Sequence, residues 1–525
     1  MPRLGALWPG LYRFRSPSNH STKNLAMTKT KKLNILILSA EVAPFAKVGG
    51  LADVAGALPK ALKALGHDVR VMMPCYKMIE DNSAYRMEEC LTDFPVPVGH
   101  SGTETAFVKQ TRITSLNSSE SIPVYLVGNA PTNGKAGYFQ DVTDSAAVYT
   151  YAPEPYAFFA RAALEAVKRL RPAWKPDILH CNDWHTGLIP VYAKQFYAAD
   201  AAFKNTRSIF TIHNLAYQGD FKQEHWGATA LPDSLRCVEG LEFHGGWSFM
   251  KGGLQFADAV NTVSENYACE IQTPEYGCGL DGLMRHLSRQ GKLRGIVNGI
   301  DQEEFNPATD TRIAANFSAS NPSGKAKCKA ALQAELKLPK KADVAVIGLI
   351  SRLADQKGFD IIAQCVEKAL ELPIQFVLLG KGDPRYADFF TELQAKYPEQ
   401  VRACITFDVD LAQRIYAGSD LFLMPSRFEP CGLGQMIALR YGSLPIVRAT
   451  GGLADTIVDF DPQNAPDGNG FVFEDYRADE LLATIARAVS QWGHRPTRQT
   501  LIQNALATDF SWERSALRYQ EMFRK

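Results

Sequence analysis

The chain has 525 residues, of which 46% are hydrophobic and 22% charged, and its formal net charge at pH 7 is +1. This length exceeds one ordinary hydrophobic core, so we expect two domains of roughly 200–250 residues each. A net charge so close to zero provides no large positive field, which argues against nucleic acid or an anionic membrane as the main partner.

Residues 1–32 differ in composition from the rest of the chain. They contain basic and small polar residues and no acid, and the first carboxylate is Glu41. Such a composition is typical of a transit peptide, and equally of a non-native start upstream of Met27. We expect this segment to be disordered in both cases. The protein is then expected in the cytoplasm, or in the plastid stroma if the segment is a transit peptide.

From residue 33 onward, strand-like and helix-like patterns alternate. A helix is expected over 50–66, and short β-branched runs that end in polar residues predict strands within 33–40, 68–74, 176–185, 208–214, 257–264 and 293–301. The alternation predicts a parallel, doubly wound sheet. Polar residues at the carboxyl ends of such strands indicate where ligands bind.

A second series of strands follows a polar stretch around 306–328, and its members lie within 343–353, 374–383, 401–407, 420–430 and 443–452. We therefore predict an α/β protein with two Rossmann-like domains, 33–300 and 301–505, that face an interdomain cleft. The final segment, 506–525, has aromatic residues at 512, 519 and 523. We expect it to form a helix that returns to the N-terminal domain.

The letters GGLAD occur twice, starting at Gly49 and at Gly451, each time after an expected strand. Glycine permits positive φ and a close approach of backbone to ligand, and the following helix start offers free N–H groups to a phosphate. Lys47 adds a full charge, and Asp53 should lie in the first helical turn. An ordinary strand-to-helix turn or a chance repeat remains the alternative. We expect both turns to face one cleft, the second forming the wall opposite the first.

Seven motifs then occur in one order: KVGGLADV, HCNDWHTGLIP, TIHNLAYQG, NGID, SRLADQKG, SRFEPCGLGQ and RATGGLAD. Together they resemble the glycogen and starch synthases of bacteria and plants, glycosyltransferase family five, over essentially all of 33–525. The resemblance implies a GT-B fold, in which two Rossmann domains enclose the active site. It also implies transfer of glucose from ADP-glucose to the non-reducing end of an α-1,4-glucan (glycogen or starch), with retention of configuration and without a metal or other cofactor.

The resemblance assigns roles to residues on the N-terminal side of the cleft. Lys47 is expected near the donor phosphates and the acceptor, and the backbone N–H of Gly50 close to the donor. Asp53 is expected near the base of the bound nucleotide sugar. His213 is expected at the glucose 6-hydroxyl and the reacting centre. Two further residues are expected in the cleft, Asp183 and Asn298.

On the other side, the resemblance implies that Arg352 and Lys357 neutralise the pyrophosphate. Glu429 would hold the sugar hydroxyls, with the backbone N–H groups of Cys431, Gly432 and Leu433 around it. The residues expected to take part in catalysis are therefore Glu429, His213, Lys47 and Asp183.

Elementary chemistry supports these charges independently. Cleavage of the glycosyl–phosphate bond leaves negative charge on the diphosphate, which Arg352 can bind as a bidentate fork and Lys357 as a point charge. A solvated surface pair is the alternative for these two cations, and a helix N-cap is the alternative for Glu429. A retaining glycosidase would need a second carboxylate about 5 Å from Glu429. The sequence offers no convincing one, which favours transfer on one face with the leaving phosphate as base.

Three weaker features concern single residues or pairs. We expect Cys431 to have some reactivity because it precedes a helix, although not as the nucleophile. Asp408 and Asp410 form a DxD pair that we expect to cap the next helix. Gly434 and Ile437 depart from residues common in related glycosyltransferases.

Two rival functions remain open at this stage. One is a glucan phosphorylase with a pyridoxal phosphate lysine, and the other is a catalytically silent glucan-binding protein. The product, the choice of ADP over UDP and the oligomeric state are also open.

Overall fold

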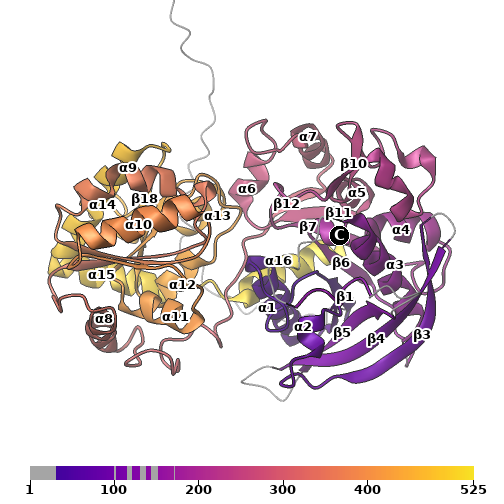
Figure 1. Cartoon of the computed structure of the whole chain (residues 1–525), viewed down its shortest axis with the longest axis horizontal. Helices are drawn as coiled ribbons and strands as arrows, with labels where there is room; N and C mark the ends of the chain where they lie inside the picture. The colour runs from indigo at the N-terminus through magenta and orange to yellow at the C-terminus, as the bar shows by residue number, and fades with distance from the viewer. Residues whose placement is uncertain (1–30, 100–101, 115–120, 131–136, 144–151, 171) are drawn as a thin grey trace, which may run out of the picture. The chain divides into compact units, whose positions relative to one another are not determined.

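A computed structural model describes residues 31–99, 102–114, 121–130, 137–143, 152–170 and 172–525 (Figure 1). The proposed transit peptide or non-native start falls almost entirely within residues 1–30, which lie outside the described residues. Residues 33–525 form one compact unit.

A nine-stranded sheet organises what we call the N-terminal lobe, residues 33–297 together with the last helix. Its strands run in the order β12-β11-β7-β6-β1-β2-β5-β4-β3, and all neighbours from β12 to β5 are parallel. The strands are β1 (Asn34–Leu38), β2 (Asp68–Pro74), β3 (Glu88–Val98), β4 (Gly102–Thr114), β5 (Ser121–Asn129), β6 (Ile178–Asn182), β7 (Arg207–Ile212), β11 (Ala259–Thr262) and β12 (Leu293–Gly295).

The alternation of strands and helices predicted a purely parallel sheet, but one edge of this sheet is antiparallel. The long strands β3 and β4 pair antiparallel with each other, and β4 pairs antiparallel with β5 at the edge of the sheet (Figure 1). A separate small sheet also forms from β8 (Asp220–Lys222), β9 (Glu242–Phe243) and β10 (Gly246–Ser248).

The C-terminal lobe, which we define as residues 306–507, contains a six-stranded, fully parallel sheet in the order β15-β14-β13-β16-β17-β18. Its strands are β13 (Ala345–Ile350), β14 (Ile374–Leu379), β15 (Val401–Cys404), β16 (Leu421–Met424), β17 (Leu444–Arg448) and β18 (Phe471–Phe473). This order matches the 3-2-1-4-5-6 arrangement of a Rossmann sheet, which confirms the predicted fold class for this lobe.

Strand order reverses direction once in each sheet. The reversal lies between β1 and β6 in the N-terminal lobe, and between β13 and β16 in the C-terminal lobe. Open parallel sheets bind their ligands in the crevice at the carboxyl ends of the strands at such a switch point. The topology alone therefore predicts a ligand site at the loops that follow these four strands.

Helices connect most of the parallel strands. In the N-terminal lobe they are α1 (Gly50–Ala64), α2 (Lys77–Glu80), α3 (Pro153–Arg169), α4 (Leu188–Phe196), α5 (Phe249–Phe256), α6 (Glu265–Glu270) and α7 (Asp281–Arg289). In the C-terminal lobe they are α8 (Gly324–Glu335), α9 (Phe359–Ala369), α10 (Pro384–Lys396), α11 (Val409–Gly418), α12 (Gly434–Arg440), α13 (Gly451–Thr456), α14 (Ala478–Gly493) and α15 (Arg495–Ala507). The last helix is α16 (Trp512–Arg524).

Helix α16 packs in the core of the N-terminal lobe, beside α1 (Figure 1). Tyr519 is fully buried there, and its hydroxyl accepts a hydrogen bond of 3.2 Å from the amide of Asn261. Gln520 bonds the ring of His67 at 2.9 Å. The C-terminus of the chain thus completes the core around its first strands.

The two segments that cross between the lobes pair with each other. Ile300 forms a bridge with Ser511, and its N–H donates to the carbonyl of Phe510 at 2.8 Å. A Cβ atom at Gly299 would lie 2.7 Å from the backbone nitrogen of Trp512. Glycine is therefore required at this point because the two crossing segments approach so closely.

None of the helices in the described part of the chain has the length and apolarity needed to cross a membrane.

We predict that Tyr519→Ala destabilises the protein by about 3–5 kcal/mol, since it leaves a cavity in the N-terminal core. Thermal unfolding checks this as a lower melting temperature. The matched control is Leu517→Ala on the same helix, where the side chain is 49% exposed and little change is expected. Equal melting temperatures for the two variants would contradict the docking of α16.

Candidate functional site

A cavity of about 2140 Å³ is lined by loops of both lobes. These loops include those that follow β1, β6 and β7 in the N-terminal lobe and β13 and β16 in the C-terminal lobe, as the switch points indicate. The residues selected from the sequence all line this cavity: Lys47, Gly50, Asp53, Asp183, His213, Asn298, Arg352, Lys357, Glu429, Cys431, Gly432 and Leu433.

The first glycine turn is held by a carboxylate that the sequence analysis missed. Glu41 is fully buried just after β1, and its Oε2 accepts hydrogen bonds from the N–H groups of Val48 at 2.7 Å and Gly49 at 3.0 Å. A buried carboxylate is stable only when such donors surround it. The available signal was an acid directly after an apolar strand and before the glycines.

Gly49 and Gly50 do not use the positive φ that glycine permits. Gly49 is extended, with φ −150° and ψ −164°, and Gly50 is the first residue of α1. A Cβ at Gly49 would contact nothing within 4 Å, and one at Gly50 would lie 3.5 Å from Cδ1 of Leu433. Gly49 therefore leaves open space, and Gly50 lies against Leu433 of the C-terminal lobe.

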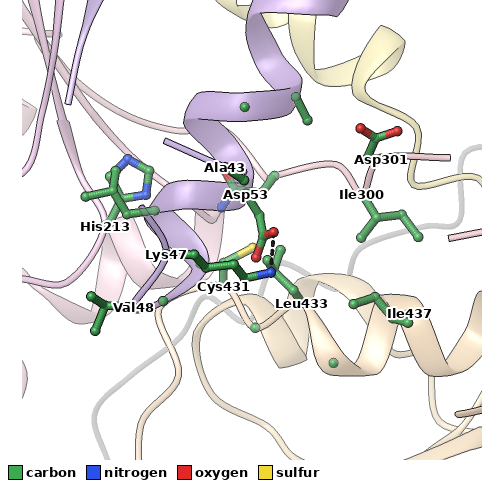
Figure 2. Close-up of a pocket in the computed structure, with 18 of the residues that line it drawn as sticks. Ala43, Lys47, Val48, Asp53, His213, Ile300, Asp301, Cys431, Leu433 and Ile437 are labelled. Atoms are coloured by element: carbon green, nitrogen blue, oxygen red, sulfur yellow. Dashed lines mark hydrogen bonds and ion pairs between the residues drawn. The ribbon is translucent and has the colours of Figure 1, made fainter. Parts of the chain in front are cut away.

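Lys47 and Asp53 form an ion pair of 2.6 Å across this turn. Figure 2 shows Lys47 pointing toward Asp53, with Leu433 of the C-terminal lobe next to them. Burial raises the pKa of Asp53, and Lys47 offsets part of the rise. Asp53 lies in the first turn of α1, which confirms its predicted place.

Asp183 follows β6 in a strained conformation, with φ 57° and ψ 176°, a region that essentially only glycine favours. Its Oδ1 accepts hydrogen bonds from the N–H groups of His213 at 2.7 Å and Asn214 at 3.4 Å. Burial raises the pKa of Asp183 to about 7, although these N–H groups offset part of the shift. The carboxylate of Asp183 thus holds the loop after β7 against the end of β6.

The imidazole of His213 is neutral at physiological pH, because burial lowers its pKa to about 3. Its Nε2 lies 3.0 Å from Oδ1 of Asn182. The amide nitrogen of Asn182 donates to the carbonyls of Leu38 at 3.1 Å and His180 at 3.2 Å, which fixes the amide orientation. Nε2 therefore carries the proton, and Nδ1 can only accept a hydrogen bond.

The charged groups of the C-terminal lobe lie after β13 and β16. Glu429 is 7% exposed, and its Oε2 accepts from Nζ of Lys357 at 2.6 Å and from Oγ of Ser426 at 3.0 Å. Arg352 is exposed, and its Nη2 donates to the hydroxyl of Tyr217 in the N-terminal lobe at 3.2 Å. Tyr217 is a further cavity residue that the sequence analysis did not single out.

The turn after Glu429 contains Gly432, which has a φ of 73° that favours glycine. Burial raises the pKa of Cys431 to about 12, and Asn298 offsets only part of this. The thiolate is therefore disfavoured, and the expected reactivity of Cys431 is wrong: burial outweighs its position before a helix. Oδ1 of Asn298 is buried and has no hydrogen-bond partner among the residues that the structure describes.

The second glycine turn does not form the opposite wall of the cavity, so that expectation is also wrong. Gly451 has a φ of 43°, and a Cβ there would overlap the carbonyl oxygen of Glu429. A Cβ at Gly452 would overlap the carbonyl oxygen of Cys431. These glycines lie behind the turn that carries Glu429, and the described cavity lining does not include them.

Asp408 of the DxD pair caps α11, as predicted, and Asp410 lies in the first turn of that helix. Oδ1 of Asp408 accepts a hydrogen bond of 2.8 Å from the N–H of Leu411 at the start of α11.

Comparisons with known proteins agree with this arrangement. Residues 34–286 match the family model described as starch synthase catalytic domain, and residues 333–508 match that of glycosyl transferases group 1. The chain is 48% identical to a glycogen synthase of Moorella thermoacetica, over 94% of this chain and 97% of the relative. It is 44% identical to a glycogen synthase of Thermotoga maritima, over 94% and 99%.

A solved structure is similar over the same extent. The catalytic domain of Starch Synthase IV from Arabidopsis thaliana, bound to ADP and acarbose, superposes with a TM-score of 0.85. Its sequence is 33% identical, and the match covers 94% of this chain and 99% of that one.

We predict that the charge of Asp183 makes stability depend on pH. Its folded pKa of about 7 lies above the ordinary value of 3.8, so the wild type loses stability as the pH rises from about 4 to 7. The loss is on the order of 4 kcal/mol. Asp183→Asn keeps an oxygen acceptor for His213 and Asn214 but does not titrate.

Melting temperatures of the two proteins between pH 4 and 9 check this. The variant should gain on the wild type up to about pH 7, after which the difference should stay level. A difference that does not change with pH would contradict the raised pKa.

Proposed function

This chain belongs to the glycogen and starch synthase family, and from this premise we propose that it transfers glucose from ADP-glucose to the non-reducing end of an α-1,4-glucan. It is a glycosyltransferase of glycogen or starch synthesis with two GT-B-type lobes. We propose that the transfer retains the configuration at the anomeric carbon.

One observation carries this proposal: two cations and a carboxylate at the C-terminal switch point line the same cavity as Lys47 and His213. A nucleoside diphosphate sugar needs positive charge at its phosphates and acceptors for its hydroxyls. Arg352 and Lys357 supply the first, and Glu429 supplies the second. The ADP bound to the Arabidopsis relative supports the choice of nucleotide.

The bond to the leaving group breaks between the anomeric carbon and the phosphate oxygen, and negative charge develops on ADP. Arg352 and Lys357 stabilise that charge in a site where fixed charges need little reorganisation. The 4-hydroxyl of the acceptor attacks the same face of the sugar, and its proton passes to the departing phosphate. The new bond from the acceptor oxygen to the anomeric carbon replaces the bond to the phosphate oxygen, and no covalent sugar–enzyme intermediate forms.

The N-terminal lobe orients the sugar in this proposal. His213 is neutral, so it cannot donate from an imidazolium, but its Nδ1 can accept a hydrogen bond from a glucose hydroxyl. Asp183 holds the backbone of His213 in place. The open space beside Gly49 lets the donor phosphates approach the backbone, with Lys47 nearby.

The Lys357–Glu429 ion pair links the two tasks. Because Lys357 bonds Glu429 at 2.6 Å, the cation for the diphosphate and the acceptor for the sugar are held as one group. Removal of either partner leaves the other charge without its neighbour, at a position 7% exposed for Glu429. We therefore expect both substitutions to be costly.

We predict that Glu429→Ala lowers the incorporation of labelled glucose from ADP-glucose into glycogen by about 10²-fold or more, and that Arg352→Ala and Lys357→Ala have similar effects. Glu392→Ala, an exposed position on α10, is the matched control and should retain full activity. Wild-type rates with UDP-glucose should be lower than with ADP-glucose. Equal activity of Glu429→Ala and wild type would overturn the assigned site.

A further inference from the structure

Helices α6 and α13 belong to different lobes and exchange hydrogen bonds. The carboxylate of Asp455, in α13, accepts from the backbone N–H of Glu265 at 2.6 Å and of Asn266 at 3.0 Å. These two groups are at the start of α6, where backbone donors have no partner within the helix. A side chain of the C-terminal lobe thus completes a helix of the N-terminal lobe.

The reverse exchange also occurs. Oε1 of Glu270, the last residue of α6, accepts from the N–H of Gly451 at 2.9 Å and from Oγ1 of Thr450 at 3.0 Å. The amide of Asn266 donates to the same oxygen at 2.9 Å. Hydrogen bonds to a carboxylate are stronger than neutral ones, so this contact fixes the start of α13 relative to the N-terminal lobe.

The start of α13 in turn lies against the backbone of Glu429. The N–H of Gly452 donates to the carbonyl of Glu429 at 3.1 Å and to that of Pro430 at 3.1 Å. Any side chain at Gly451 would overlap the same Glu429 carbonyl. Because the two backbone segments are in close contact, a shift of Gly451 must also shift Glu429.

A second link runs parallel to the first. Arg448, at the end of β17, donates through Nε to the carbonyl of Ser426 at 3.0 Å and through Nη2 to that of Arg427. Its Nη2 also lies 3.5 Å from the hydroxyl of Tyr276 in the N-terminal lobe. Arg448 therefore holds the residues just before Glu429, and Gly452 holds the carbonyl of Glu429 itself. Arg448 contacts the N-terminal lobe directly, and Gly452 is linked to it through Gly451.

We propose that Glu270 is a positioning residue for the transfer reaction: from the N-terminal lobe it sets the place of Glu429 in the C-terminal lobe through Gly451. The proposal rests on the role of Glu429 proposed above. Glu270 and Asp455 do not occur in the cavity lining of the described residues, so neither acts by touching substrate. The exchange makes the geometry of the sugar-binding carboxylate depend on how the two lobes engage.

The test is the steady-state kinetics of Glu270→Ala with ADP-glucose and glycogen. We expect kcat to fall by about 10-fold to 10²-fold, since a misplacement of roughly 1 Å at the reacting groups has effects of this size. The KM for ADP-glucose should change less than kcat, because Arg352, which also binds the diphosphate, is not part of the Lys357–Glu429 pair. Glu270→Gln keeps an oxygen acceptor for Gly451 and should recover most of the rate. Glu275→Ala, exposed on the loop after α6, is the matched control.

A double variant separates positioning from general stability. If Glu270 acts through Glu429, adding Glu270→Ala to Glu429→Ala should cause no further loss of kcat. A lowered melting temperature with an unchanged kcat, or losses that multiply in the double variant, would overturn the proposal. Should Glu270→Ala fail to fold, Glu270→Asp decides in its place: the shorter side chain withdraws the carboxylate from the N–H of Gly451, and an unchanged kcat would likewise overturn the proposal.

The outcomes distinguish this inference from the assignments it rests on. A wild type that transfers no glucose from ADP-glucose would refute the proposed function, and a fully active Glu429→Ala would refute the site. An active wild type, an impaired Glu429→Ala and an unimpaired Glu270→Ala would refute the positioning role alone.

Discussion

Hydrogen bonds from backbone N–H groups to carboxylates hold the loops around the cavity, and the geometry of the site depends on them. Glu41 binds the glycine turn after β1, and Asp183 binds the loop after β7. Glu270 and Asp455 bind the starts of two helices in opposite lobes. Loops have few internal partners for their N–H groups, and a buried carboxylate needs several donors, so each satisfies the requirement of the other. Anchored in this way, irregular segments can present functional side chains with the precision of a sheet.

These anchors place opposite tasks on the two lobes. The C-terminal lobe concentrates charge, with Arg352 and the Lys357–Glu429 pair after two neighbouring strands. The N-terminal lobe contributes a neutral His213, the Lys47–Asp53 ion pair and open space beside Gly49. The direct contact between Arg352 and Tyr217 shows how closely the two sets approach.

The sequence was informative wherever local pattern decides structure. Periodicity and helix-end chemistry are contained in short stretches of sequence. They predicted the apolar strands, the position of Asp53 and the cap formed by Asp408. Failures occurred where distant segments meet. The two GGLAD copies look alike in sequence, yet Gly49 faces open space while Gly451 packs against the Glu429 carbonyl, and only the partner distinguishes them. Cys431 was misjudged for the same reason, since its burial depends on the tertiary fold. Glu270 and Gly451 are 181 residues apart in the sequence, and no local sequence pattern indicates their contact.

The central claim is that the cations after β13, the carboxylate after β16 and the anchored loops of the N-terminal lobe act on one diphosphate sugar. A crystal structure of the protein with ADP tests it most directly. The account predicts that Arg352 and Lys357 both lie within hydrogen-bond distance of the diphosphate. The hydrogen bonds from the N–H of Gly49 to Glu41 and from the N–H of Gly451 to Glu270 should remain intact. A diphosphate bound elsewhere, with Arg352 and Lys357 both facing solvent, would contradict it.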